Sequence, residues 1–226
     1  MLLEVCAYSL SSCRIAREAG ADRVELCADP LQGGTTPSWG MITAAMELGL
    51  PVFPMIRPRG GDFIYNSEEL DVMWRDIRAC RELGCPGIVA GAQRSDGSLD
   101  VGLMKRIVQE AGPLAVICHK VFVRSAGSSS ALEVLIEAGC ARVLTSGLHA
   151  NALEGARIIK QLVAQAAGRI VVMPGGGVRS ENIAEIIAAT GATEYHSSAI
   201  TANSTDHIAD PNEVQALVQV LRLGGR

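Results

Sequence analysis

Two Glu-x-Cys triplets make this sequence a candidate for soft-metal chemistry. Each ends a short apolar run, the first as Glu4-Val5-Cys6 and the second as Glu25-Leu26-Cys27. Side chains alternate between the two faces of a strand, so the glutamate and the cysteine of each triplet share a face. Neighbouring parallel strands lie about 4.8 Å apart, which brings the two sulfurs within reach of one ion. Cys6 and Cys27 are therefore candidate ligands for Cu(I); the other interpretation is a pair of small buried hydrophobes.

A second chemistry, the recognition of an anion, is indicated where the apolar run Val52–Ile56 continues into Arg57-Pro58-Arg59-Gly60-Gly61. Arg57 and Arg59 share one face of this strand. On an inward face, Arg57 neutralises Glu4 or Glu25, either as a structural partner for a buried carboxylate or as a clamp for a substrate. Arg59 is a candidate anion-binding residue beside it.

A histidine near the middle of the chain adds a candidate acid–base group. It lies in Cys118-His119-Lys120, at the end of another apolar run. Imidazole titrates near neutral pH and serves as a general base or as a metal ligand. Alternation places His119 on the opposite face from Cys118, so the two are not expected to act together. His196 and Ser198 are candidate hydrogen-bonding partners in the same region.

The elements that must position these residues repeat along the chain. A short apolar run, a loop, an amphipathic segment and a glycine follow one another eight times. The strands are predicted to begin near Leu2, Arg23, Val52, Gly87, Leu114, Arg142, Ile170 and Glu194. Helix-ending glycines are predicted at Gly20, Gly49, Gly84, Gly112, Gly139, Gly168 and Gly191, and Gly224 follows the last helix. Helix starts are predicted at Ser67, at Asn151 with Glu154, and at Asp210-Pro211.

Eight strand–helix units with apolar strands predict a (β/α)₈ TIM barrel, as a single domain over residues 1–226. An open, doubly wound sheet is the alternative. In a TIM barrel the functional groups sit at the carboxyl ends of the strands. A charged glutamate is not expected against the helices, so Glu4, Cys6, Glu25 and Cys27 are expected to face the barrel interior.

The glycine run Gly175-Gly176-Gly177 follows the seventh predicted strand and precedes a helix. TIM barrels commonly bind phosphate with the loops after strands seven and eight. Glycines expose backbone N–H groups, and a helix N-terminus favours negative charge. Gly175, Gly176 and Gly177 are therefore candidate anion-binding residues; the alternative is a tight turn that requires positive φ.

Composition excludes several classes of partner. The 226 residues are 48% hydrophobic and 19% charged, with a net charge of -4 and 4% aromatic residues. This balance argues against binding to nucleic acid. No apolar run is long enough to cross a membrane, and none resembles a signal peptide. Seven cysteines without a CxxC pair indicate reduced thiols and a cytoplasmic protein. The expected ligand is a small ion or a small molecule.

The sequence resembles the CutC family of copper homeostasis proteins. The matching stretches run from Leu3 to Ala199 and read LEVCAYS, GADRVELCADPLQGGTTPS, PVFPMIRPRGGDFIY, RVLTSG, ALEG, GRIVVMPGGGV and GATEYHSSA. The resemblance implies a TIM barrel, a cytoplasmic location and a homo-oligomer, a dimer or a tetramer. The cysteines to which the family's copper binding is attributed fall on Cys6 and Cys27. After the fifth strand, Lys120 and Val123 replace the arginine and aspartate that family members usually carry, and lysine lacks the fork geometry of arginine.

Two functions follow as expectations. The first is a cytoplasmic copper homeostasis protein that binds Cu(I) through Cys6 and Cys27. The alternative is an enzyme that acts on a small phosphorylated or carboxylated metabolite. In that enzyme Gly175–Gly177 hold the anion, Arg57 and Arg59 clamp a carboxylate or a second phosphate, and Glu25 or His119 moves the proton. A weaker third option is a module that senses a ligand without turnover.

Overall fold

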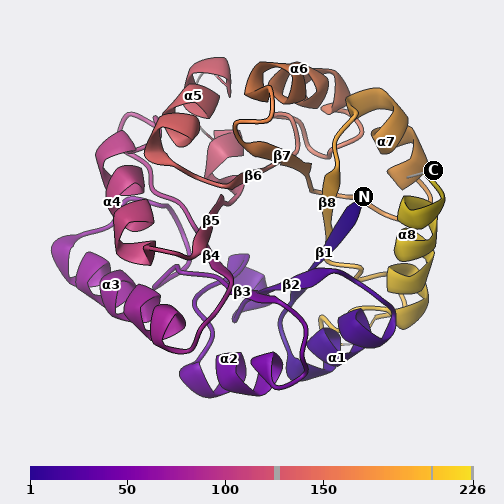
Figure 1. Ribbon diagram of the computed structural model, residues 1–226, viewed down its shortest axis with the longest axis horizontal. Helices are drawn as coiled ribbons and strands as arrows, with labels where there is room; N and C mark the ends of the chain where they lie inside the picture. The colour runs from indigo at the N-terminus through magenta and orange to yellow at the C-terminus, as the bar shows by residue number, and fades with distance from the viewer. Residues whose placement is uncertain (125–127, 205, 225–226) are drawn as a thin grey trace.

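In the computed structural model, parallel strands form a closed ring and helices surround it (Figure 1). The structure describes residues 1–124, 128–204 and 206–224. The strands are β1 (Leu2–Ala7), β2 (Arg23–Leu26), β3 (Val52–Pro54), β4 (Gly87–Ala90), β5 (Ala115–Cys118), β6 (Arg142–Thr145), β7 (Val171–Pro174) and β8 (Glu194–Ser197). The α-helices are α1 (Leu10–Glu18), α2 (Trp39–Met46), α3 (Ser67–Glu82), α4 (Val101–Ala111), α5 (Ser128–Ala138), α6 (Ala156–Ala166), α7 (Ile183–Thr190) and α8 (Pro211–Leu223). Two 3₁₀ turns, η1 (Pro30–Gln32) and η2 (Lys120–Arg124), follow β2 and β5.

The ring closes through two four-stranded sheets, in the orders β3-β2-β1-β8 and β4-β5-β6-β7. One seam is a parallel bridge between Met55 and Val89, where the Ile56 N–H donates to the Val89 carbonyl at 2.7 Å. At the other seam β7 and β8 lie side by side (Figure 1). A closed ring of parallel strands confirms the (β/α)₈ barrel and excludes the open sheet, because an open sheet would leave two free edges.

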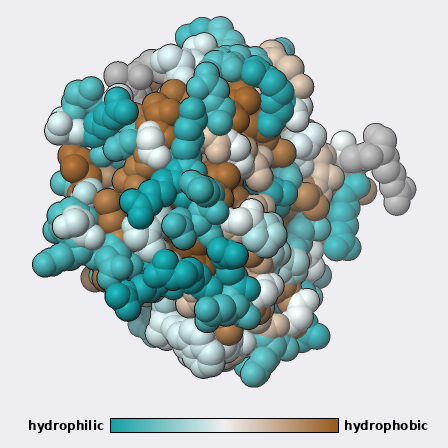
Figure 2. Space-filling view, turned by 60° about the vertical axis from the view of Figure 1, so that its left-hand side comes forward, coloured by the Kyte–Doolittle hydropathy of each residue, from teal (hydrophilic) through white to brown (hydrophobic). Residues whose placement is uncertain are grey.

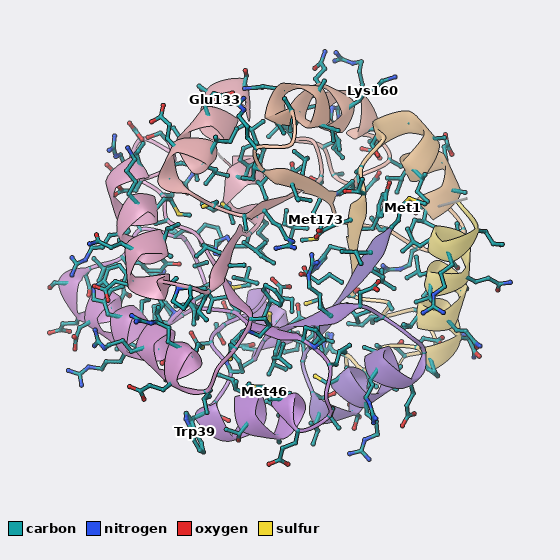
Figure 3. The ribbon with its side chains drawn as sticks, viewed as in Figure 1. Met1, Trp39, Met46, Glu133, Lys160 and Met173 are labelled. Carbon is teal, nitrogen blue, oxygen red and sulfur yellow. The ribbon has the colours of Figure 1, made fainter. Side chains whose placement is uncertain are left out.

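Two apolar clusters fill the molecule. The larger lies between the strands and the helices and includes the buried face of α3, with Met73, Trp74, Ile77 and Cys80. The smaller fills the barrel interior and consists of Cys6, Cys27, Phe53, Met55, Val89, Ile117 and Met173. Met173 lies inside the ring in Figure 3. The two cysteines of the Glu-x-Cys triplets therefore face the interior, as predicted.

The predicted boundaries agree closely with the structure. Six strands begin at the predicted residue, and β5 and β7 begin one residue later, at Ala115 and Val171. All seven predicted helix-ending glycines have positive φ. Gly224 differs, with a φ of −76°.

One predicted helix start is wrong, and at another, α3, the helix begins at Ser67 as predicted but the capping residue differs. Asn66 caps α3 in place of Ser67, because its side chain accepts the N–H groups of Glu68 and Glu69. Asn151 and Glu154 form a turn that precedes α6, whose N-cap is Gly155.

On the face shown in Figure 2, hydrophilic residues are exposed with apolar residues between them. The large apolar side chains that are exposed in the described residues are Leu2, Leu31, Trp39, Ile64, Val72 and Leu223. None of the described helices has both the length and the apolar character that a membrane span requires.

Candidate functional site

The barrel mouth brings together a thiol, a carboxylate and an imidazole from three adjacent strands. Cys6 on β1, Glu25 on β2 and His196 on β8 are buried, and their potential ligand atoms all lie within 4.8 Å of one another. The strand register places them there, because Cys6 pairs with Glu25 while Glu4, two residues earlier, pairs with His196. We call these three residues and Cys27 the mouth cluster.

Cys27 joins the cluster through its sulfur. It directly follows β2, and its N–H donates to the Ala7 carbonyl at 2.9 Å, which continues the β1–β2 pairing by one residue. Its thiol donates a hydrogen bond to Cys6. The backbone of Gly34, in the loop after β2, packs over it, since a Cβ on Gly34 would lie 3.1 Å from the Cys27 sulfur. That loop therefore covers the cluster on the Cys27 side.

Hydrogen bonds within the cluster separate the pKa values of the two thiols. The bond from Cys27, and then the contacts with His196, lower the pKa of Cys6 well below its ordinary value. The same bond, together with burial, raises the pKa of Cys27. Burial and the neighbouring Cys6 charge raise the pKa of Glu25 well above its usual range. These shifts favour the thiolate at Cys6 and the protonated forms of Cys27 and Glu25.

Glu4 orients His196. Nδ1 of His196 lies 2.8 Å from Oε1 of Glu4, and Nε2 lies 3.7 Å from Oε2 of Glu25. Burial opposes the charge on the imidazole, but the bonds to Cys6 and Glu4 outweigh it and raise the pKa of His196. A carboxylate that holds one ring nitrogen and directs the other is a common support for metal-binding histidines and for catalytic ones.

A buried ion-pair chain underlies the cluster. Arg23 donates to Oε2 of Glu4 and to Oε2 of Glu194, at 2.6 Å in each case. Arg142 extends the chain with a 2.7 Å bond to Glu194. The prediction that Arg57 neutralises Glu4 or Glu25 is therefore wrong: Arg23 performs that role for Glu4, because the β1–β2 register pairs the two residues directly.

Arg57 binds backbone carbonyls. Its guanidinium donates to the carbonyl groups of Gln32, Gly34 and Gly61 at 2.7–2.9 Å. It also lies 4.8 Å from the centroid of the Phe63 ring. Arg57 thus connects the loop after β2 to the loop after β3. These contacts indicate that it supports the mouth and do not indicate a substrate clamp.

Arg59 lies outside the mouth. Its guanidinium bonds Glu69 of α3 at 2.6 Å and Asp62 at 3.0 Å, and it also donates to the carbonyl of Ile64. The side chain is 38% exposed. These contacts draw Arg59 toward the start of α3, and its guanidinium is held there by two carboxylates.

His119 is buried against Phe63. Its ring centroid lies 4.6 Å from that of Phe63, and its Nδ1 accepts the N–H of Val121. Burial, and then the charges of Arg57 and Lys120, lower the pKa of His119 to about 3. The imidazole is therefore neutral near pH 7 and positioned beside Arg57. The histidine that joins Cys6 and Glu25 is His196.

A pocket of about 380 Å³ opens beside the cluster. His196 contributes its inner wall, and the other lining residues are Lys120, Leu144, Thr145, Ser146, His149, Ala150, Gly175 and Gly176. Lys120, at the rim, donates to the Gly33 carbonyl at 3.0 Å and so also contacts the loop after β2. Val123 belongs to η2, and its side chain lies outside the described residues.

Gly175 and Gly176 of the glycine run line this pocket, but not every N–H group of the run is available to bind a phosphate. The N–H of Gly175 donates to the Thr145 carbonyl at 2.9 Å, and Gly176 and Gly177 have φ values of 92° and 68°, which fits the tight-turn alternative. Near the start of α7, Glu213 accepts the N–H and the hydroxyl of Ser180 at 2.7 Å each. A protein carboxylate thus binds the loop that joins the glycine run to α7.

Comparison with known proteins identifies the family. The model of the CutC family matches residues 1–201. The CutC family protein of Parabacteroides distasonis is 48% identical over 200 residues, which cover 88% of this chain and 82% of the relative. The chain belongs to the CutC family. The human relative, named copper homeostasis protein cutC homolog, is 47% identical over 88% of this chain and 73% of its own length. A crystal structure of CutC from Streptococcus agalactiae superposes with a TM-score of 0.82 at 35% identity, covering 88% of this chain and 98% of that one.

The sequence missed part of this CutC-family site. Glu4, Cys6, Glu25 and Cys27 follow from strand alternation, but the role of His196 depends on β8 pairing with β1 across the closed ring. The sequence pattern predicts Arg23 only as the first residue of a strand, whereas the structure pairs its side chain with Glu4 and Glu194. The one available signal was an arginine two residues before Glu25, on the face already assigned to the interior.

Proposed function

We propose that this protein is a cytoplasmic copper-handling protein that binds Cu(I) between Cys6 and Cys27, with Nε2 of His196 as a third ligand. The observation that supports this most directly is the convergence of Cys6, Glu25 and His196 within 4.8 Å at the barrel mouth, with the Cys27 thiol hydrogen-bonded to Cys6. Thiolate ligands select Cu(I), and imidazole also suits copper. Relatives at 47% and 48% identity carry the name copper homeostasis protein.

The residues present fit this ion. Metal ligands must be deprotonated, and Cys6 already favours its thiolate, so binding would release the remaining protons from Cys27 and from Nε2 of His196. Glu4 keeps the imidazole in place through Nδ1. Glu25 is a hard oxygen donor with a raised pKa and a hydrogen bond to Cys6, which suits it to positioning that sulfur.

A cytoplasmic location and a homo-oligomer belong to the same proposal. All seven cysteines are free and buried. A reducing compartment maintains such thiols, and a soft-metal site made of cysteines requires them.

The central test replaces Cys6 and Cys27 by serine. Anaerobic Cu(I) titration against a competing chelator is expected to show one ion per chain fewer for the double variant than for the parent. Each single variant should lower the affinity for that ion by at least about 100-fold, since loss of an outer-shell partner alone lowers metal affinity by about 10- to 100-fold. Cys140→Ser, another buried thiol, is the control and should bind like the parent. Equal stoichiometry and affinity in the double variant would contradict the proposal.

The pocket beside the cluster favours a second candidate function, catalysis on a small carboxylated or phosphorylated molecule. A site that only holds an ion does not require a 380 Å³ pocket lined by a lysine, two histidines and glycine backbone. In this candidate Lys120 and Gly176 contact the anion and His196 moves the proton. Arg57 and His119 support the mouth from outside it.

Thermal unfolding in the presence of inorganic phosphate or ribose 5-phosphate tests this candidate. A ligand at 100 times its Kd stabilises the folded state by about 2.7 kcal/mol, or about 5–10 °C in Tm for a chain of this size. Lys120→Ala should remove the shift, whereas Lys105→Ala on α4 should retain it. An unchanged Tm with both compounds, or a shift that survives Lys120→Ala, speaks against an anion in this pocket.

A further inference from the structure

A second group of sulfur atoms lies at the opposite end of the barrel from the mouth cluster. It consists of Met46, the last residue of α2, Cys80 in the last turn of α3, and Cys85, which precedes β4. Cys6 and Cys27 lie at the carboxyl ends of their strands, whereas Cys85 lies before the first residue of its strand. We call this group the basal sulfur cluster.

The chain reversal after α3 brings the two cysteines together. α3 ends at the C-cap Leu83, and Gly84 follows with a φ of 74°. The N–H of Cys85 donates to the Cys80 carbonyl at 3.0 Å, and that of Gly84 donates to the Arg81 carbonyl at 3.0 Å. These two bonds define a Schellman motif, in which the side chains of the residues corresponding to Cys80 and Cys85 meet. A hydrogen bond links the two thiols.

Met46 completes the cluster from a separate helix. The Cys85 thiol donates to the Met46 sulfur at a distance of 3.6 Å. Met46 packs partly buried against the main core at the end of α2 (Figure 3). Metal–thiolate bonds are about 2.3 Å long, so two sulfurs on one ion lie about 3.8 Å apart in tetrahedral and about 4.6 Å apart in linear geometry. From the observed 3.6 Å, the separation of Cys85 and Met46 needs to grow by about 0.2 Å for tetrahedral geometry and by about 1 Å for linear geometry.

The cluster lies just below the surface. Cys80 and Cys85 are 1% and 3% exposed, but Gly84 and Pro86, on either side of Cys85, are exposed, and Met46 is partly exposed. The donors are two thiols and a thioether. The one group of three or more histidine, cysteine or acidic ligands in the described residues is at the mouth, so no such set accompanies the basal sulfurs. Sulfur-only donors select soft monovalent ions over Mg²⁺ or Ca²⁺.

We propose that Met46, Cys80 and Cys85 form a second soft-metal site, which binds one Cu(I) or Ag(I) ion per chain independently of the mouth cluster. Binding forms up to three sulfur–metal bonds and transfers the two thiol protons to solvent, with no change in oxidation state. The site does not depend on the function proposed for the mouth. Its position on the outside of the barrel, beneath the turn after α3, gives an ion a route that does not pass through the mouth.

Native mass spectrometry of the reduced protein with Ag(I), a soft ion without redox chemistry under these conditions, tests the site. The parent is expected to bind two ions, and Cys6→Ser/Cys27→Ser should retain one. Adding Cys80→Ser and Cys85→Ser to that variant should remove the last ion, while adding Cys140→Ser, the matched buried-thiol control, should leave it. X-ray absorption of the ion held by Cys6→Ser/Cys27→Ser should show sulfur neighbours and no nitrogen.

Met46→Leu keeps both thiols and nearly the same volume, so it separates ligation from folding. In the Cys6→Ser/Cys27→Ser background it should weaken Ag(I) binding by about tenfold while circular dichroism remains unchanged. A folded Cys6→Ser/Cys27→Ser variant that binds no ion overturns the basal site and leaves the mouth site standing. If the parent binds one ion and only the replacement of Cys80 and Cys85 removes it, the basal site stands and the mouth site is overturned. An ion that persists when all four cysteines are replaced overturns the assignment to these residues.

Discussion

Replacing Arg23 by methionine is expected to lower the free energy of unfolding by about 3–5 kcal/mol, the usual cost of removing one partner from a buried ion pair. Arg23 is 5% exposed and lies between Glu4 and Glu194, with 2.6 Å bonds to both. Methionine retains much of the volume but leaves two buried carboxylates to share His196 and Arg142. Urea unfolding, followed by circular dichroism and fluorescence, measures the loss.

Arg75→Met is the matched control for this experiment. Arg75 pairs with Asp71 on the exposed face of α3, where both side chains are more than half exposed, and such pairs contribute about 0–1 kcal/mol. Glu4→Gln in the Arg23→Met background should recover part of the stability, because the uncompensated charge is removed with its partner. If Arg23→Met costs no more than Arg75→Met, the central chain of ion pairs does not stabilise the barrel.

Gly155→Ala should destabilise the protein by about 3 kcal/mol, at the upper end of the usual cost of overpacking. Gly155 caps α6 with an ordinary φ of −83°, so the constraint is space and not backbone conformation. An added Cβ would overlap the Ser146 carbonyl oxygen and lie 2.9 Å from the Gly147 Cα, both backbone atoms that cannot rotate away. The displaced segment includes Ser146 and His149, which line the mouth pocket. Urea unfolding of the variant checks the magnitude.

Gly40→Ala is the corresponding control. Gly40 lies in the first turn of α2, and a Cβ there meets no atom within 4 Å. Alanine favours helix by up to about 1 kcal/mol over glycine, so this variant should be as stable as the parent or slightly more stable. Similar losses in both variants would show that the contact of Gly155 with the backbone of Ser146 and Gly147 does not limit the side chain at residue 155.

Most of the framework could be predicted because its signals are local. Strand starts, the glycines after the helices and the shared face of Glu4 with Cys6 depend on residues a few positions apart. The helix caps were less predictable. Asn66 and Ser67 are both good cap residues, and the side-chain geometry that distinguishes them is not encoded in residue type.

The partners of charged residues were less predictable still. Arg57 was assigned to a glutamate from its charge and its presumed inward face, but the carbonyls of two loops offer it three close acceptors. Arg59 similarly finds Glu69 at the start of the next helix. A guanidinium has several donors and a long reach, so its partner depends on where loops fold and not on strand alternation.

The sequence by itself determined the eightfold repeat, the (β/α)₈ class and the inward face that carries Cys6, Cys27 and their glutamates. These depend on the two-residue period of a strand and on helix-ending signals, both of which act over short distances along the chain. Only the tertiary structure decided that His196 joins the thiols, that Arg23 neutralises Glu4, and that Met46 approaches Cys85. Each of these contacts requires ring closure or helix packing to bring distant segments together, and no local pattern records which segments will meet.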